Sequence, residues 1–167
     1  MEGASDDPGL LIVWHSRTGA SERMAVAAEQ AAGKEGRVKR CEAAVVDADQ
    51  MLAAQGYLFV CPENLGSVSG TMKELFDRLY YPLLGQVEGR AYGTIIAAGS
   101  DGTGAQQQID RIVTGWRLKR VVDPLIVNFD AQTPEAILAP KTVPDKALNA
   151  CSKIGAALAA GLAMGVF

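Results

Sequence analysis

The chain has 167 residues, of which 49% are hydrophobic and 21% are charged, and its formal net charge is −3. This length suits one domain, residues 1–167, with a sizeable core, and the composition is that of a globular protein. The mildly acidic balance argues against a nucleic-acid partner, because a nucleic-acid surface would be basic.

The N-terminus, the cysteines and the C-terminal stretch suggest where the protein works. Residues 1–9 are acidic and polar, unlike a secretory leader, so we expect a loose tail over residues 1–8 and no export. Three scattered cysteines and one histidine predict reduced thiols in the cytoplasm and no metal site. Residues 154–167 are apolar or Gly but too short to span a bilayer, so we expect a buried helix and no membrane partner.

The first two predicted elements are joined by a short polar loop. Five apolar residues at positions 10–14 predict a strand buried on both faces, and Met24, Ala27, Ala28 and Ala31 share one face of the helix that follows. A helix start offers unpaired backbone N–H groups, and the hydroxyls and glycine of this loop add donors and close backbone approach. The loop therefore predicts a phosphate site, although the same residue types also cap helices. It lacks the lysine of a P-loop and the GxGxxG spacing.

The remaining elements alternate between strands and helices. We expect strands over residues 37–46, 56–61 and 92–98. We expect a fifth strand at 121–127 that Pro124 interrupts, so that it lies at the sheet edge or contains a bulge. We expect helices from about residue 71 to before Pro82, from 104 to about 118, and from 145 to the end, with a loop or short helix over 128–141.

This order predicts an α/β three-layer sandwich. Its five-stranded parallel sheet has the flavodoxin-like order 2-1-3-4-5, with helices on both faces. In that topology ligands bind outside the carboxyl ends of the strands. Gly- and hydroxyl-rich loops follow strands one, three and four, so we expect all three to crowd the same edge.

These loops resemble those of the flavodoxin superfamily. Ser16, Thr18, Gly19 and Ser21 match the flavodoxin phosphate loop, with Ala20 where that family more often has Asn. The segment PENLGSVSGTMKELFDR, residues 62–78, is similar to the part of NAD(P)H-dependent FMN and quinone reductases that holds the isoalloxazine ring.

The resemblance implies FMN as the cofactor and NAD(P)H as a co-substrate. Three groups of residues would bind the flavin. The phosphate would lie among Ser16, Arg17, Thr18, Gly19, Ala20 and Ser21. The ring would lie beside the backbone of Pro62, Glu63, Asn64, Leu65, Gly66 and Ser67. Its other side would be closed by Ser100, Asp101, Gly102, Thr103 and Gly104. Because the flavin itself carries the hydride chemistry, we expect no dedicated catalytic residue.

The leading functional hypothesis is an oxidoreductase that passes electrons from NAD(P)H to a quinone or similar small acceptor. One alternative is a flavodoxin-type electron carrier, although flavodoxins usually flank the flavin with aromatics and the second and third loops have none. Another is a flavodoxin-like interaction module without a cofactor. A receiver domain does not fit, because it needs acidic residues at the end of the first strand, where this chain has Trp14 and His15. A small tyrosine phosphatase does not fit, because it needs an arginine six residues after its cysteine, and Ser67 stands six residues after Cys61.

Several single residues have a simpler structural interpretation. His15 and the two tryptophans suit core or structural positions, Asp101 suits a turn, and Lys73 with Asp77 suits a surface pair. The last helix is apolar on nearly all sides, so we expect a homodimer or larger homo-oligomer.

Overall fold

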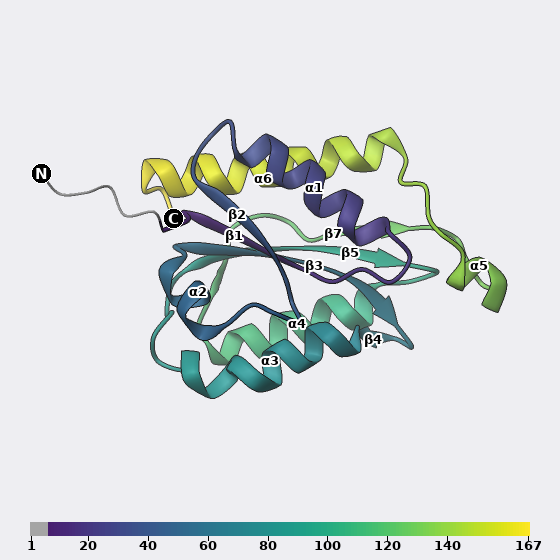
Figure 1. The fold of residues 1–167 in the computed structure, drawn as a ribbon, viewed down its shortest axis with the longest axis horizontal. Coiled ribbons are helices and arrows are strands. Elements are labelled where there is room, and N and C mark those ends of the chain that lie inside the picture. The colour runs from purple at the N-terminus through teal and green to yellow at the C-terminus, as the bar shows by residue number, and fades with distance from the viewer. Residues whose placement is uncertain (1–6) are drawn as a thin grey trace, which may run out of the picture.

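Among the residues that the structure describes, seven strands form one sheet, and its central part is parallel (Figure 1). The structure is a computed structural model that describes residues 7–167. The strands are β1 (Leu10–Trp14), β2 (Val38–Glu42), β3 (Gly56–Asn64), β4 (Ser67–Val68), β5 (Ala91–Ala98), β6 (Lys119–Arg120) and β7 (Leu125–Asn128). The helices are α1 (Ala20–Ala32), α2 (Ala48–Ala53), α3 (Gly70–Leu83), α4 (Thr103–Gly115), α5 (Pro134–Leu138) and α6 (Asp145–Met164).

The predicted parallel sheet is confirmed, and its strand order differs slightly from the prediction. The sheet runs β2-β1-β3-β5, and the fifth predicted strand appears as two pieces, β6 and β7, that both pair parallel with β5. The break covers residues 121–124, so Val121 and Val122 lie between the two pieces, and Pro124 within it cannot donate to the ladder. The short strand β4, which pairs antiparallel with the end of β3, was not predicted.

Two element boundaries differ from the prediction. The second strand is Val38–Glu42 and ends before the predicted residues 43–46, because Ala43 and Val46 turn into the core after the strand ends. The guanidinium of Arg78 holds this turn by donating to the carbonyl oxygens of Val46 and Ala43 at 2.6 and 3.0 Å. Helix α3 continues through Pro82, which lies in its last turn, so the missing N–H costs the helix only one hydrogen bond near its end.

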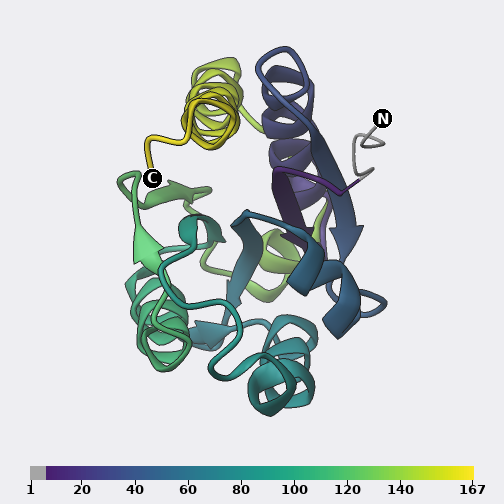
Figure 2. The same ribbon diagram turned by 90° about the vertical axis from the view of Figure 1, so that its left-hand side faces the viewer.

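The helices cover both faces of the sheet. Figures 1 and 2 show α1 and α6 on one face and α2, α3 and α4 on the other. Each face has its own apolar core, one around Phe59, Phe76 and Trp116 and one around Leu10, Met24 and Leu58. The short helix α5 lies beyond the carboxyl ends of the central strands (Figure 1).

Helix α6 is long and apolar enough to cross a membrane, judged by length and composition alone. In the fold it packs along α1, and the two backbones approach so closely that a Cβ at Gly155 would lie 2.2 Å from the carbonyl oxygen of Ala28. Core helices of globular proteins meet the same criteria, so this is weak evidence for a membrane span. The predicted loose tail falls mostly on residues 1–6, which lie outside the described residues.

Candidate functional site

A narrow cleft of about 50 Å³ lies at the carboxyl edge of the sheet, and we call it the edge cleft. Arg17, Thr18 and Ala20 of the first loop line it, together with Pro62, Glu63 and Asn64 of β3. The end of β5 and the segment after β7 complete its walls with Ala97, Ala98, Gly99, Phe129, Ala131, Ile137 and Lys141. Segments distant in sequence therefore meet at one edge, as the loop pattern predicts.

The first loop has the local geometry of an anion site. Gly19 is the N-cap of α1 with φ 91°, its own N–H donates to Ser16 Oγ at 3.1 Å, and a Cβ placed there would meet nothing within 4 Å. Ser21, in the first turn of α1, is 1% exposed, and its Oγ has no hydrogen-bond partner within residues 7–167. A buried hydroxyl without a partner costs free energy, so one at a positive helix end suits an anionic ligand.

The second loop is a tight hairpin between β3 and β4. Leu65 and Gly66 form its tip with φ values of 53° and 72°, and the Leu65 side chain is fully exposed. Ser67 Oγ and the Val68 N–H both donate to Gln108 Oε1, at 2.7 and 2.8 Å, which fastens the hairpin to α4.

The third loop is bound by the second. The Glu63 carboxylate accepts hydrogen bonds from the N–H groups of Gly102 at 2.9 Å and Ala105 at 3.0 Å. A Cβ at Gly104 would lie 2.1 Å from the Gly66 carbonyl oxygen, so the hairpin tip packs directly on the start of α4. The Glu63 carboxylate thus uses two N–H donors at the start of α4.

The structure therefore separates the expected site residues into groups. Arg17, Thr18, Ala20, Pro62, Glu63 and Asn64 line the edge cleft, whereas Leu65, Gly66 and Ser67 form the hairpin tip beside it. The five residues from Ser100 to Gly104 lie outside the lining, and Asp101 instead accepts hydrogen bonds from the N–H and hydroxyl of Thr103. Of the third loop, Gly99 at its start lines the cleft, and the structure adds the segment after β7, which the loop pattern did not indicate.

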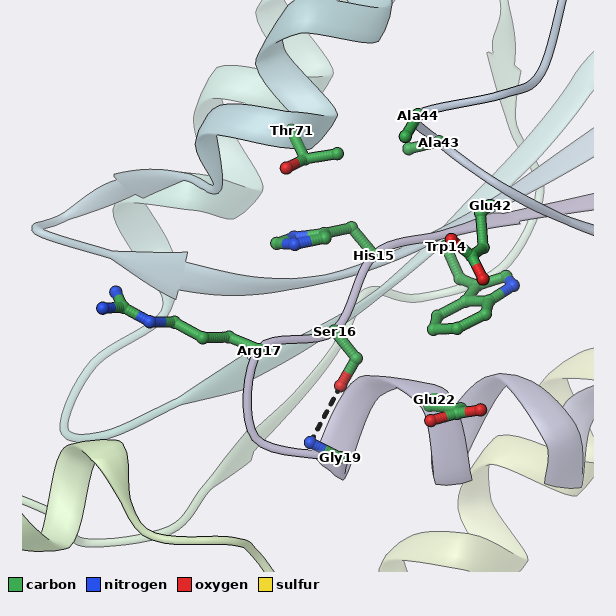
Figure 3. A pocket seen from close by; sticks show the side chains of 10 residues that line it. All are labelled: Trp14, His15, Ser16, Arg17, Gly19, Glu22, Glu42, Ala43, Ala44 and Thr71. Atoms are coloured by element: carbon green, nitrogen blue, oxygen red, sulfur yellow. Dashed lines mark hydrogen bonds between the residues drawn. The ribbon is translucent and has the colours of Figure 1, made fainter.

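A second cleft of about 300 Å³ lies on the β2 side of the first loop, and we call it the flank cleft (Figure 3). Ser16, Arg17 and Gly19 line it, with His15, Glu22, Glu42 and Thr71 around them. His15 Nδ1 lies 2.8 Å from Ser69 Oγ. Burial lowers the pKa of His15 from 6.5, an effect that Glu42 opposes and Arg17 reinforces, so the imidazole is neutral at pH 7.

The remaining singled-out residues have structural surroundings. Trp116 is fully buried, and Trp14 packs in the other core with Arg40 5.3 Å from its ring. Lys73 and Asp77 form a surface ion pair at 2.6 Å. Burial raises the pKa of the Cys61 thiol to about 12, which makes it a poor nucleophile. Within residues 7–167, no three His, Cys, Asp or Glu side chains gather in a group that could hold a metal ion.

The fold and the arrangement of its edge define a flavodoxin-like protein. The profile of the family described as "NADPH-dependent FMN reductase" matches residues 33–133, more than half of the chain. The chain belongs to this family.

The chain is also similar to flavodoxins and to a WrbA-like protein. A flavodoxin from Aquifex aeolicus is 28% identical over 164 residues, covering 93% of this chain and 87% of that protein. A solved flavodoxin from the domain Archaea superposes with a TM-score of 0.74 at 15% identity, covering 92% of this chain and 97% of its own. A flavodoxin-fold WrbA-like protein from Agrobacterium tumefaciens gives a TM-score of 0.67 at 17% identity, covering 93% of this chain and 97% of its own.

The family and the flavodoxin relative support FMN as the cofactor. The chemistry of the first loop fits the phosphate of FMN, because the open space over Gly19 lies at the start of α1. The unpartnered Ser21 hydroxyl lies in the first turn of the same helix, although Ser21 lines neither cleft. Arg17 lines both clefts and supplies a positive charge beside this loop.

Proposed function

We propose that this protein is an FMN-dependent oxidoreductase that takes hydride from NAD(P)H and passes electrons to a quinone or a similar small acceptor. The observation that carries the proposal is the Ser21 hydroxyl, buried and unpartnered at the start of α1 within the described chain, beside a glycine with open space above it. A phosphate monoester suits this place better than a neutral ligand, because it accepts several hydrogen bonds and favours a positive helix end.

The residues of the chain would bind and orient the cofactor. Ser16, Thr18 and Ser21 would surround the phosphate, and Arg17 would neutralise part of its charge. The ends of β3 and β5, with Pro62 and Gly99, would lie along the ring. When bound, FMN supplies hydride acceptance and electron transfer, so the protein contributes binding, orientation and exclusion of water.

An electron carrier of the flavodoxin kind is the second candidate. The flavodoxin relative from Aquifex aeolicus, which aligns with 93% of this chain, favours it. The edge cleft also has one aromatic wall residue, Phe129, although it comes from the segment after β7 and not from the loops that flank the flavin in flavodoxins.

Reduction of the bound flavin separates these candidates. Purified protein loaded with FMN is mixed anaerobically with NADH or NADPH, and the visible flavin band is followed before and after a quinone is added. Bleaching by a nicotinamide nucleotide and recovery with the quinone supports the oxidoreductase. Bleaching by dithionite alone would assign the protein to the carriers.

We place this activity in the cytoplasm with small-molecule partners. Cys41, Cys61 and Cys151 are all unpaired thiols, which suits a reducing compartment. The location is tested by extracting the protein from cells into acid, which stops thiol exchange, and counting its free thiols. Oxidised cysteines in the extracted protein would contradict a reducing location.

A further inference from the structure

One wall of the edge cleft differs from the others in how it is held. The phosphate loop and strands β3 and β5 are fixed by the core, with Ala20, Ala97 and Ala98 exposed by 6% or less. The opposite wall is formed by Phe129, Ala131, Ile137 and Lys141. Of these, Ile137 belongs to the segment Gln132–Pro140, which contains α5 and has no buried residue. Widening the cleft would therefore displace this segment at the lowest cost.

The segment is fastened only near its ends. On one side, Ala131 is buried and its N–H donates to the Gly99 carbonyl at 2.8 Å. On the other side, the Lys141 N–H donates to the Thr18 carbonyl at 3.0 Å. The segment thus bridges from the end of β5 to the phosphate loop, across the place where a flavin ring would lie.

The hydrogen bonds inside the segment make α5 a small unit of its own. Thr133 Oγ1 accepts from the Ala136 N–H at 3.2 Å, and the Lys141 ammonium donates to three carbonyl oxygens, those of Ala136, Ile137 and Ala139. Asp130, two residues before the segment, has a φ of 51°, a left-handed conformation that side chains rarely adopt. These features allow α5 to move as one body about its two ends.

The size of the edge cleft requires such a movement if a ring is to enter. Sites for small molecules and cofactors usually enclose about 300–1,000 Å³, whereas the edge cleft measures about 50 Å³. Ile137 lines the cleft and is still 46% exposed, so it has apolar surface left to bury against a ring. Its neighbour Leu138 is 57% exposed but does not line the cleft.

We propose that Gln132–Pro140 is a lid over the edge cleft, and that Ile137 is the lid residue that closes on the isoalloxazine ring and sets access to it. The lid opens about its two ends, next to Ala131 and Lys141, to admit the flavin, and then buries Ile137 against the ring. An electron acceptor must enter beside Ile137, which makes this residue a determinant of acceptor size. This inference rests on the proposed FMN site.

The test compares FMN binding kinetics of the wild-type protein, Ile137→Ala and the matched control Leu138→Ala. Flavin-free protein is mixed with FMN in a stopped-flow instrument, and flavin fluorescence reports association and dissociation. Because Ile137→Ala removes apolar surface that the lid buries, we expect dissociation to accelerate about fivefold to tenfold. We expect Leu138→Ala to stay within about twofold of the wild type. Both side chains are exposed, so both variants should fold.

Hydrogen exchange gives a second readout that does not depend on activity. FMN should slow backbone exchange over residues 132–140 and leave α2, residues 48–53, unchanged. The lid proposal is wrong, and the proposed function stands, if the wild type binds FMN but two results follow. These are equal FMN dissociation rates in all three proteins and no slowing of exchange over residues 132–140 by FMN. If the wild type binds no FMN, the proposed function falls and the lid falls with it.

Discussion

At the scale of single residues, Ser21 carries the argument for a phosphate. Its buried hydroxyl lacks a partner in the described chain, so Ser21→Ala should leave the free energy of unfolding unchanged or slightly raised. The same change should weaken FMN binding about tenfold, because it removes one hydrogen bond to a charged group. Riboflavin, which has no phosphate, should bind both proteins equally.

The control for this prediction is Ser152→Ala, which removes a hydroxyl that contacts the Ala27 carbonyl, away from the phosphate loop. Its FMN affinity should match the wild type in fluorescence titrations. An equal loss of FMN and riboflavin affinity in Ser21→Ala would place the serine outside the phosphate site.

His15 should give the folded protein a distinct pH dependence. Burial lowers its pKa from 6.5 in the folded state, so the unfolded chain binds this proton more readily. Its contribution to stability is therefore full above about pH 6.5 and decreases as the pH falls below that value. Urea unfolding at several pH values should show a smaller loss of stability between about pH 7 and 5 in His15→Asn than in the wild type. Identical losses would assign the pH dependence to other groups.

Residue patterns could predict the first loop, but they could not predict the hydrogen-bond partners of the residues in the second loop. The Ser, Thr and Gly spacing of the first loop indicates its geometry, because a helix start and a left-handed glycine are local features. Glu63 was expected to contribute only its backbone beside the ring, whereas its carboxylate binds the start of α4, 39 and 42 residues further along. Such a long-range contact leaves no local pattern in the sequence.

At the scale of elements, the hairpin and α4 form one unit through Glu63. Glu63→Gln removes the charge that stabilises the start of α4, so we expect a loss of about 1–2 kcal/mol in the free energy of unfolding. Urea denaturation measures this loss, and FMN affinity should fall with it as the hairpin loosens.

Glu74→Gln is the matched control for Glu63. Glu74 pairs with Arg78 on the exposed face of α3, and such pairs contribute little, about 0.3–0.5 kcal/mol. Equal losses in the two variants would mean that the Glu63 carboxylate does not hold the hairpin.

Elements were predicted well where the pattern is strong and poorly where tertiary contacts decide. Strand β1 follows from five apolar residues, and the break at Pro124 follows from proline chemistry. Strand β4 has two residues and is held by hydrogen bonds to Gln108 of helix α4. The sequence of the strand alone therefore does not indicate it. The cleft wall at residues 129–141 could have been suspected, because β7 also ends at the ligand-binding edge.

At the scale of the whole molecule, we propose that the protein self-associates through the C-terminal end of α6. Met164, the last residue of α6, is 71% exposed, and Val166 and Phe167, just after the helix, are 64% and 38% exposed, so apolar side chains reach the surface at this end. Light scattering at micromolar concentration should give at least twice the chain mass. Met164→Glu should reduce that mass, and a wild-type mass of one chain would contradict the proposal.

The account as a whole depends on the edge of the sheet being a flavin phosphate site. The most direct measurement is a titration of flavin-free protein with FMN and, in parallel, with riboflavin, followed by flavin fluorescence. The account expects saturable binding of one FMN per chain, at least about tenfold tighter than riboflavin, because only FMN fills the donors around Ser21. Equal affinity for the two flavins, or no binding of either, would contradict it.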